Sequence, residues 1–170
     1  MTAAHRIELG RVLRPVGLRG EVKLLPAADC WPAALTSRHL RLEGAGGAEP
    51  VSVTASRPAG LCLVLRLAEI ADRDAAEARR DAVLVLEGEL DVPPPDEVRP
   101  FQVMGLRVVT AGGEALGEVT GLEPMPAQPL LTVRGGGKEY AIPWVEPILR
   151  GVDWEAGVIT VDPPEGLLDL

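Results

Sequence analysis

Short apolar runs separated by glycine and proline dominate this sequence, which holds 19 glycines and 16 prolines in 170 residues. Short runs rich in Val and Leu, with turn residues at both ends, predict β-strands rather than helices. The predicted strands are 7–13, 21–25, 39–42, 51–55, 61–67 and 83–86 in the first half, and 106–110, 115–122, 130–134, 138–143 and 158–162 in the second. Their spacing predicts an all-β chain built as small barrels or sandwiches.

Three segments depart from the strand pattern. Asp72 is a good helix N-cap, and alanines followed by two arginines suit a helix, so residues 73–80 are predicted to form one short helix. Pro147 leaves room for only one turn of helix within residues 144–150. Three consecutive prolines at 93–95 favour an extended, semi-rigid connector. We therefore expect a first domain over residues 1–90, a linker over 91–98 and a second domain over 99–170.

The charged residues are distributed unevenly along the chain. The net charge of −8 argues by itself against a general nucleic-acid-binding protein. However, residues 1–90 contain 12 basic and 12 acidic side chains, whereas residues 91–170 contain 5 and 13. Seven of the bases and only three of the acids fall within the first 41 residues. A basic segment over the first 41 residues and an acidic second half over residues 91–170 predict two surfaces that have different partners.

The basic segment over the first 41 residues contains a glycine-rich loop. Arg14, Arg19 and Lys23 lie on it or beside it, and Gly17 and Gly20 would allow its backbone to approach a partner closely. Clustered guanidinium groups suit phosphate contacts, so these three cations are candidate RNA-binding residues. The segment has no aromatic side chain, which argues against base stacking and favours contacts to the RNA backbone or shape. A tight β-turn with solubilising arginines is the alternative.

Little in the sequence indicates an enzyme. The glycines at 135–137 precede Lys138, but the spacing does not fit a phosphate-binding loop, and a β-hairpin turn is predicted there instead. Cys30 and His39 could form a nucleophile pair, or a metal site with Asp29, but they lack any local signature. We expect these three residues to be structural or on the surface, and we expect no bound metal.

The cysteine content and the apolar runs indicate in which cellular compartment the protein is expected. The two cysteines are isolated, nothing near the start resembles a signal peptide, and the longest apolar stretch, 61–65, is too short to span a bilayer. We therefore expect a soluble, cytoplasmic protein without membrane contact. Phe101, just after the linker, is a candidate core residue or interface anchor.

Four segments, in this order, resemble the RimM family of bacterial ribosome maturation factors. Residues 10–22 resemble the family's opening glycine, its basic-Pro-x-Gly-Leu-x-Gly loop and the Glu-Val that follows; residues 72–77 resemble its mid-domain helix; and residues 134–143 and 161–168 resemble its C-terminal domain. The resemblance covers nearly the whole chain. It implies two β-barrels, the second of the PRC-barrel type, and an assembly factor that is not an enzyme and needs no cofactor.

The resemblance also implies partners. The family assists late assembly of the small ribosomal subunit at its head, where it engages the head protein numbered nineteen and influences folding of nearby ribosomal RNA. Its second domain usually opens with adjacent tyrosines linked to ribosomal-protein binding, but Val98 and Arg99 stand there in this chain. We therefore expect Arg99 and Phe101 to provide that anchor. The family's loop histidine is Val16 here, and the usual closing glycine of the helix is Asp81.

The leading hypothesis is a monomeric assembly factor that divides its contacts between two domains. Its basic loop would touch ribosomal RNA, and its acidic second domain would hold a basic ribosomal protein. Two alternatives remain open: a protein-only adaptor without RNA contact, and a small enzyme that uses Cys30 and His39.

Overall fold

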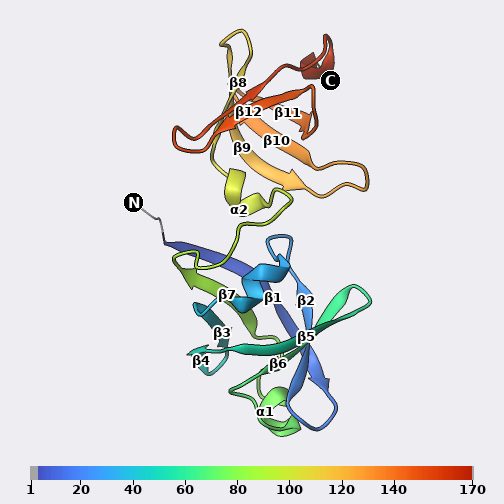
Figure 1. Cartoon of the computed structure of the whole chain (residues 1–170). Helices are drawn as coiled ribbons and strands as arrows, with labels where there is room; N and C mark the ends of the chain where they lie inside the picture. The colour runs from blue at the N-terminus through green and yellow to red at the C-terminus, as the bar shows by residue number, and fades with distance from the viewer. Residues whose placement is uncertain (1–3, 170) are drawn as a thin grey trace. The chain divides into compact units, whose positions relative to one another are not determined.

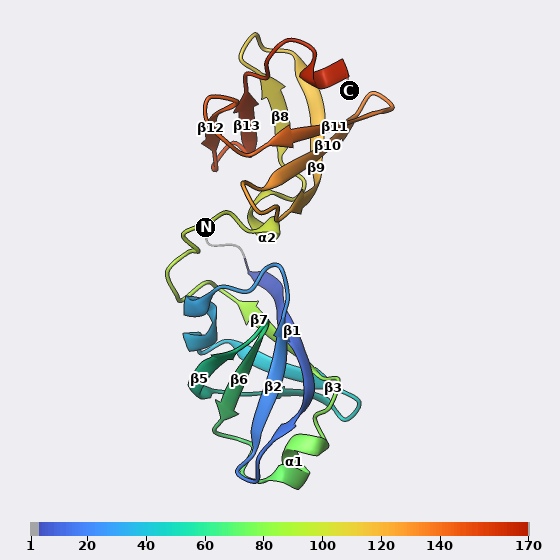
Figure 2. The same ribbon diagram turned by 90° about the vertical axis from the view of Figure 1, so that its right-hand side faces the viewer.

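The chain forms two compact units, each built around one β-sheet (Figure 1; Figure 2). The computed structural model describes residues 4–169, and the division falls between residues 97 and 98. We call the two parts the first unit and the second unit. Strands dominate both units and the helices are short, which confirms the prediction of an all-β fold.

Seven strands of the first unit form one sheet in the order β4-β3-β7-β1-β2-β6-β5. The strands are β1 (His5–Val16), β2 (Glu21–Pro26), β3 (Leu40–Gly44), β4 (Gly47–Pro50), β5 (Val53–Ala59), β6 (Cys62–Leu67) and β7 (Val83–Gly88). Neighbouring strands are antiparallel, and the long β1 lies between β2 and β7. Figure 2 shows the strands wrapping around a common interior, which is filled by buried side chains such as Leu9, Leu24 and Leu84.

Six strands of the second unit form the order β11-β10-β9-β8-β13-β12. They are β8 (Arg107–Thr110), β9 (Ala115–Glu123), β10 (Leu130–Gly135), β11 (Lys138–Pro143), β12 (Leu149–Asp153) and β13 (Val158–Val161). Only β13 and β8 pair in parallel among these described strands. Val108, Val133 and Ile159 are among the fully buried core residues. Gly136 and Gly137, both with positive φ, form the predicted hairpin turn between β10 and β11.

Several elements differ from the sequence prediction. The single turn expected within residues 144–150 is present, closed by a hydrogen bond from the N–H of Leu149 to the carbonyl of Val145, but it is not a helix, and Leu149 then pairs with Val161 as the start of β12. Strands β4 and β12 were not predicted, and neither was helix α2 (Pro100–Val103). Short 3-10 turns, η1 (Pro32–Thr36) and η2 (Leu167–Asp169), are likewise additional elements.

Helix α1 (Arg73–Glu77) is shorter than the predicted 73–80. The carboxylate of Asp72 accepts a hydrogen bond from the N–H of Ala75 at 2.8 Å, which confirms the N-cap. The N–H of Arg79 bonds to the carbonyl three residues before it, so the helical geometry tightens after Glu77. The chain then leaves the helix through Asp81, whose φ is +69°.

Replacing Asp81 with glycine should stabilise the first unit by about 0.5 kcal/mol. A left-handed conformation strains a residue that has a Cβ, and this relief outweighs the greater entropy that glycine loses on folding. The measurement is the urea midpoint of the first unit. Ala78→Gly is the matched control, because Ala78 has a φ of −65° and should lose stability instead. A lower midpoint for Asp81→Gly would show that the aspartate side chain itself stabilises this bend.

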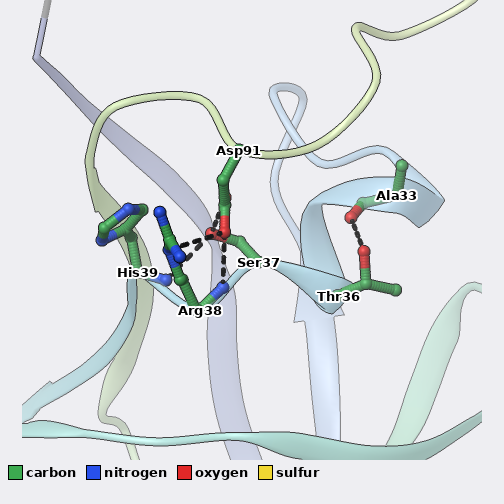
Figure 3. Close-up of polar contacts among 6 residues, drawn as sticks. All are labelled: Ala33, Thr36, Ser37, Arg38, His39 and Asp91. Carbon is green, nitrogen blue, oxygen red and sulfur yellow. Dashed lines mark hydrogen bonds and ion pairs between the residues drawn. The ribbon is translucent and has the colours of Figure 1, made fainter.

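The segment that follows β7 is fixed to the first unit (Figure 3). The carboxylate of Asp91 accepts hydrogen bonds from the hydroxyl of Ser37 at 2.6 Å and from the N–H of Arg38 at 2.9 Å. Two residues further on, the carbonyl of Pro93 accepts a hydrogen bond from the indole N–H of Trp31 at 2.9 Å. We call these three contacts the linker clamp. Residues 91–93 are therefore held by the barrel that precedes them.

Candidate nucleic-acid interface

Arg14 and Lys23 lie directly opposite each other on neighbouring strands. The register of β1 and β2 pairs Arg14 with Lys23, and on either side it pairs Val12 with Leu24 and Pro15 with Val22. Val12, Val22 and Leu24 are fully buried. Because side chains alternate along a strand, Arg14 and Lys23 must point to the outer face of the sheet.

This arrangement places two positive charges side by side. Directly opposed residues on one face of an antiparallel pair have Cβ atoms roughly 5 Å apart, and like charges there are destabilising. Within residues 4–169, neither side chain forms an ion pair with a carboxylate, and the Arg14 guanidinium only donates to the carbonyl of Pro15 at 3.4 Å. The two cations are thus available to an external anion.

Further cations extend the same face. Lys23 is paired with Val64 of β6, and Val64 with Arg57 of β5, so Arg57 occupies the same cross-strand row. The adjoining rows hold Arg11 of β1 and Arg66 of β6, which are both exposed. We define the basic face as Arg11, Arg14, Lys23, Arg57 and Arg66. Glu21 lies among these residues and pairs with Arg57 at 2.8 Å, so it offsets only part of the charge.

The glycine-rich loop lies between β1 and β2 and rests on the segment that leads into α1. Gly17 and Gly20 have φ values of +66° and +86°. A Cβ on Gly20 would lie 2.4 Å from the carbonyl oxygen of Ile70, so the backbones approach as closely as only glycine allows. The carbonyl of Gly17 also accepts a hydrogen bond from the guanidinium of Arg73 at 3.0 Å. Arg19 lies at the exposed end of this fixed loop.

The turn that follows helix α1 supports the hairpin with a second arginine, Arg80. The guanidinium of Arg80 donates to the carbonyl of Leu13 at 3.0 Å and also bonds to the carboxylate of Glu77. This carboxylate contact raises the pKa of Arg80 and lowers the pKa of Glu77. The charge of Arg80 is therefore largely matched by Glu77 at the end of helix α1, unlike the charges of Arg14 and Lys23.

Arg99 and Phe101 lie in the second unit, at the start of α2. Arg99 is the N-cap residue, and its N–H donates to the side-chain oxygen of Gln102 at 2.8 Å. Both Arg99 and Phe101 are half-buried, whereas Val103 at the end of the helix is fully buried in the core. The predicted site residues thus form two groups, one on each unit.

Cys30 and His39, which the enzyme hypothesis pairs, have different surroundings. Cys30 lines an apolar groove of about 420 Å³ with Trp31 and Leu63. The ring of His39 lies beside the backbone of Gly88, where an added Cβ would be 3.1 Å away. Within residues 4–169, no group of three or more His, Cys, Asp or Glu side chains is placed to hold a metal ion. None of the helices described there is long and apolar enough to cross a membrane.

Comparisons with known proteins cover almost all of the chain. Residues 7–90 match the model of the RimM N-terminal domain, and residues 100–167 match that of the RimM PRC barrel domain. The ribosome maturation factor RimM of Frankia alni is 38% identical over 176 residues, covering 96% of this chain and 97% of that protein. The protein of the same name from Thermobifida fusca is 36% identical over 169 residues, covering 97% and 98%.

A solved structure is also similar. It is a chain from Pseudomonas aeruginosa described as a 16S ribosomal RNA processing protein RimM, with 23% identity and a TM-score of 0.44 over 94% of this chain and 98% of that one. The sheets and the two model matches define a protein in which a RimM-type N-terminal domain is followed by a PRC barrel. The chain belongs to the RimM family.

Proposed function

We propose that this chain is a ribosome maturation factor that assists late assembly of the small-subunit head and catalyses no reaction. Its family membership and the names of its near-full-length relatives support this function. The observation on the chain itself that carries the proposal is the opposition of Arg14 and Lys23 on the basic face. Two adjacent cations without carboxylate partners do not stabilise the fold, because they repel each other. The phosphates of an RNA backbone would supply the negative charge that these cations lack.

The basic face and the loop would bind RNA through its phosphates. Arg14 and Lys23 provide one pair of cations, and Arg19 extends the site along the fixed loop. The strands that carry the basic face, β1, β2, β5 and β6, contain no Phe, Tyr or Trp, so bases have no aromatic platform on which to stack there. Such contacts position a protein on RNA and do not read its sequence. The first unit would therefore recognise folded ribosomal RNA by shape and charge.

The second unit would hold a basic ribosomal protein, namely the head protein numbered nineteen. Its residues 98–169 carry 10 acidic and 5 basic side chains. Arg99 and Phe101 at the start of α2 would provide the anchor in place of the family's tyrosines. Complementary charge mainly accelerates association, and its effect weakens as salt is added. The protein contact should thus be fast and sensitive to salt.

The triple variant Arg14→Ala/Arg19→Ala/Lys23→Ala tests the RNA contact. We expect its affinity for small-subunit ribosomal RNA to fall about tenfold, and the slope of log affinity against log salt to decrease by roughly 2 to 3. Filter binding of the full-length protein across a salt series measures both. Arg41→Ala/Arg107→Ala/Lys138→Ala removes the same charge elsewhere and serves as the control.

The outcomes separate the alternatives. Equal losses in the two triple variants would mean that net charge alone sets RNA affinity. An unchanged affinity and slope in the Arg14/Arg19/Lys23 variant, with normal association with assembling subunits, would favour the protein-only adaptor.

A further inference from the structure

The β12–β13 hairpin carries an exposed tryptophan between two carboxylates. Trp154 directly follows Asp153, the last residue of β12, and precedes Glu155. Trp154 is 55% exposed. Tryptophan is the residue type most enriched among those that dominate binding energy, because its indole offers a large rigid surface with one polar group. An exposed indole at a hairpin tip is therefore suited to a partner rather than to the core.

Hydrogen bonds fix the backbone that presents this indole. The carboxylate of Asp153 accepts from the N–H of Ala156 at 3.0 Å, and the carbonyl of Asp153 accepts from the N–H of Gly157 at 2.8 Å. Gly157 has a φ of +70°, which lets the chain turn back into β13 (Val158–Val161). A turn fixed in this way loses little conformational entropy on binding.

The surrounding charge favours a cation as the ligand of Trp154. The carboxylate of Asp153 is engaged within the turn, while Glu155 is exposed beside the indole in sequence. Arg150, the basic residue of β12, faces Asp162 of the same hairpin at 3.9 Å, so its charge is offset. Cations are attracted to the face of an indole, and a nearby carboxylate adds to that attraction. A nucleic acid would instead bring phosphates next to two carboxylates.

We propose that Trp154, assisted by Glu155, anchors an arginine or lysine side chain of a basic protein segment. The inference rests on the proposed function for the kind of partner, and it adds a contact residue on a different element from α2. Arginine fits better than lysine, because its flat guanidinium can stack on the indole while its N–H groups reach a carboxylate.

Titration of the full-length protein with nona-arginine and with the head protein numbered nineteen tests the anchor. Trp154→Ala should weaken both interactions about tenfold, and Trp154→Phe should weaken them less because phenylalanine keeps an aromatic face. Glu155→Gln should lower both affinities and flatten their salt dependence. Met125→Ala, which removes another half-exposed apolar side chain of the second unit, should bind like the original chain.

Each result has a distinct meaning. Equal binding of nona-arginine by the original chain and by Trp154→Ala overturns the anchor. A second outcome is that nona-arginine binds in a Trp154-dependent way while neither the original chain nor any variant binds the head protein. This would overturn the partner named in the proposed function and would leave the anchor intact. Loss of RNA binding in Trp154→Ala, with protein binding unchanged, would show that the indole contacts nucleic acid instead.

Discussion

Replacing Gly20 with alanine should cost the first unit about 2–4 kcal/mol of unfolding free energy. The new Cβ would lie 2.4 Å from the carbonyl oxygen of Ile70 and 3.0 Å from the nitrogen of Asp72. Both are backbone atoms, so no side-chain rotation can relieve the overlap. The φ of +86° adds strain to any residue with a Cβ. The loop would separate from the segment before α1, and the hairpin that carries Arg14 and Lys23 would lose this support.

Urea unfolding followed by tryptophan fluorescence measures this loss. With Trp144 and Trp154 replaced by phenylalanine, buried Trp31 reports on the first unit alone. The control is Gly17→Ala: Gly17 shares a positive φ but has no atom within 4 Å of an added Cβ, so this change should cost only about 1 kcal/mol. Equal losses at the two glycines would show that the close approach to Ile70 does not fix the loop.

Removing the carboxylate of the linker clamp should have the next largest effect. Asp91→Ala is expected to destabilise the first unit by about 2 kcal/mol at neutral pH. Ser37 is only 4% exposed, so its hydroxyl would be left buried without an acceptor, and the N–H of Arg38 would lose its partner as well. The same urea experiment measures the change. Asp96→Ala, in the same proline-rich segment, removes an exposed carboxylate and should leave the midpoint unchanged.

The clamp also predicts a pH dependence. The hydrogen bond from Ser37, and after it the N–H of Arg38, hold the pKa of Asp91 below its usual value of 3.8. Because the folded-state pKa is the lower one, this stabilisation is complete above the unfolded pKa and is lost as pH falls through the folded one. The stability difference between the original chain and Asp91→Asn should therefore be constant above about pH 5 and shrink in stronger acid. A difference that persists unchanged at low pH would mean that the ionised carboxylate is not the stabilising form.

Most strands could be predicted because their apolar runs are bounded by glycine or proline. The exceptions have physical reasons. Strand β4 consists of Gly47–Pro50 and has no apolar run, so only its pairing with β3 makes it a strand. Strand β12 follows Pro147 and includes Gly151, and both residues weaken the local strand pattern. The segment is a strand because it pairs with β13. Local patterns predict what a segment favours, and tertiary pairing decides segments without a strong preference.

The candidate site could be predicted only in part. Sequence placed Arg14 and Lys23 near one loop, but their opposition depends on an irregularity at Leu13, which lies between the pairs Val12–Leu24 and Arg14–Lys23. If pairing continued regularly from Val12–Leu24, Leu13 would pair with Lys23 and Arg14 with Val22, so Arg14 would point into the core. Arg57 and Arg66 join the basic face only through the pairing of β5, β6 and β2, which no local motif signals.

The linker clamp limits the length of chain that connects the two proposed binding surfaces. Beyond Pro93, only residues 94–97 precede the second unit, and the five residue steps from Pro93 to Val98 can span no more than about 18 Å. Once one unit is bound to an assembling subunit, a tether this short presents the other at an effective concentration in roughly the millimolar range. Under the proposed function, the two contacts together would then hold the factor more firmly than either contact alone. Loss of either proposed contact would leave only the affinity of the other, so the factor could leave stepwise.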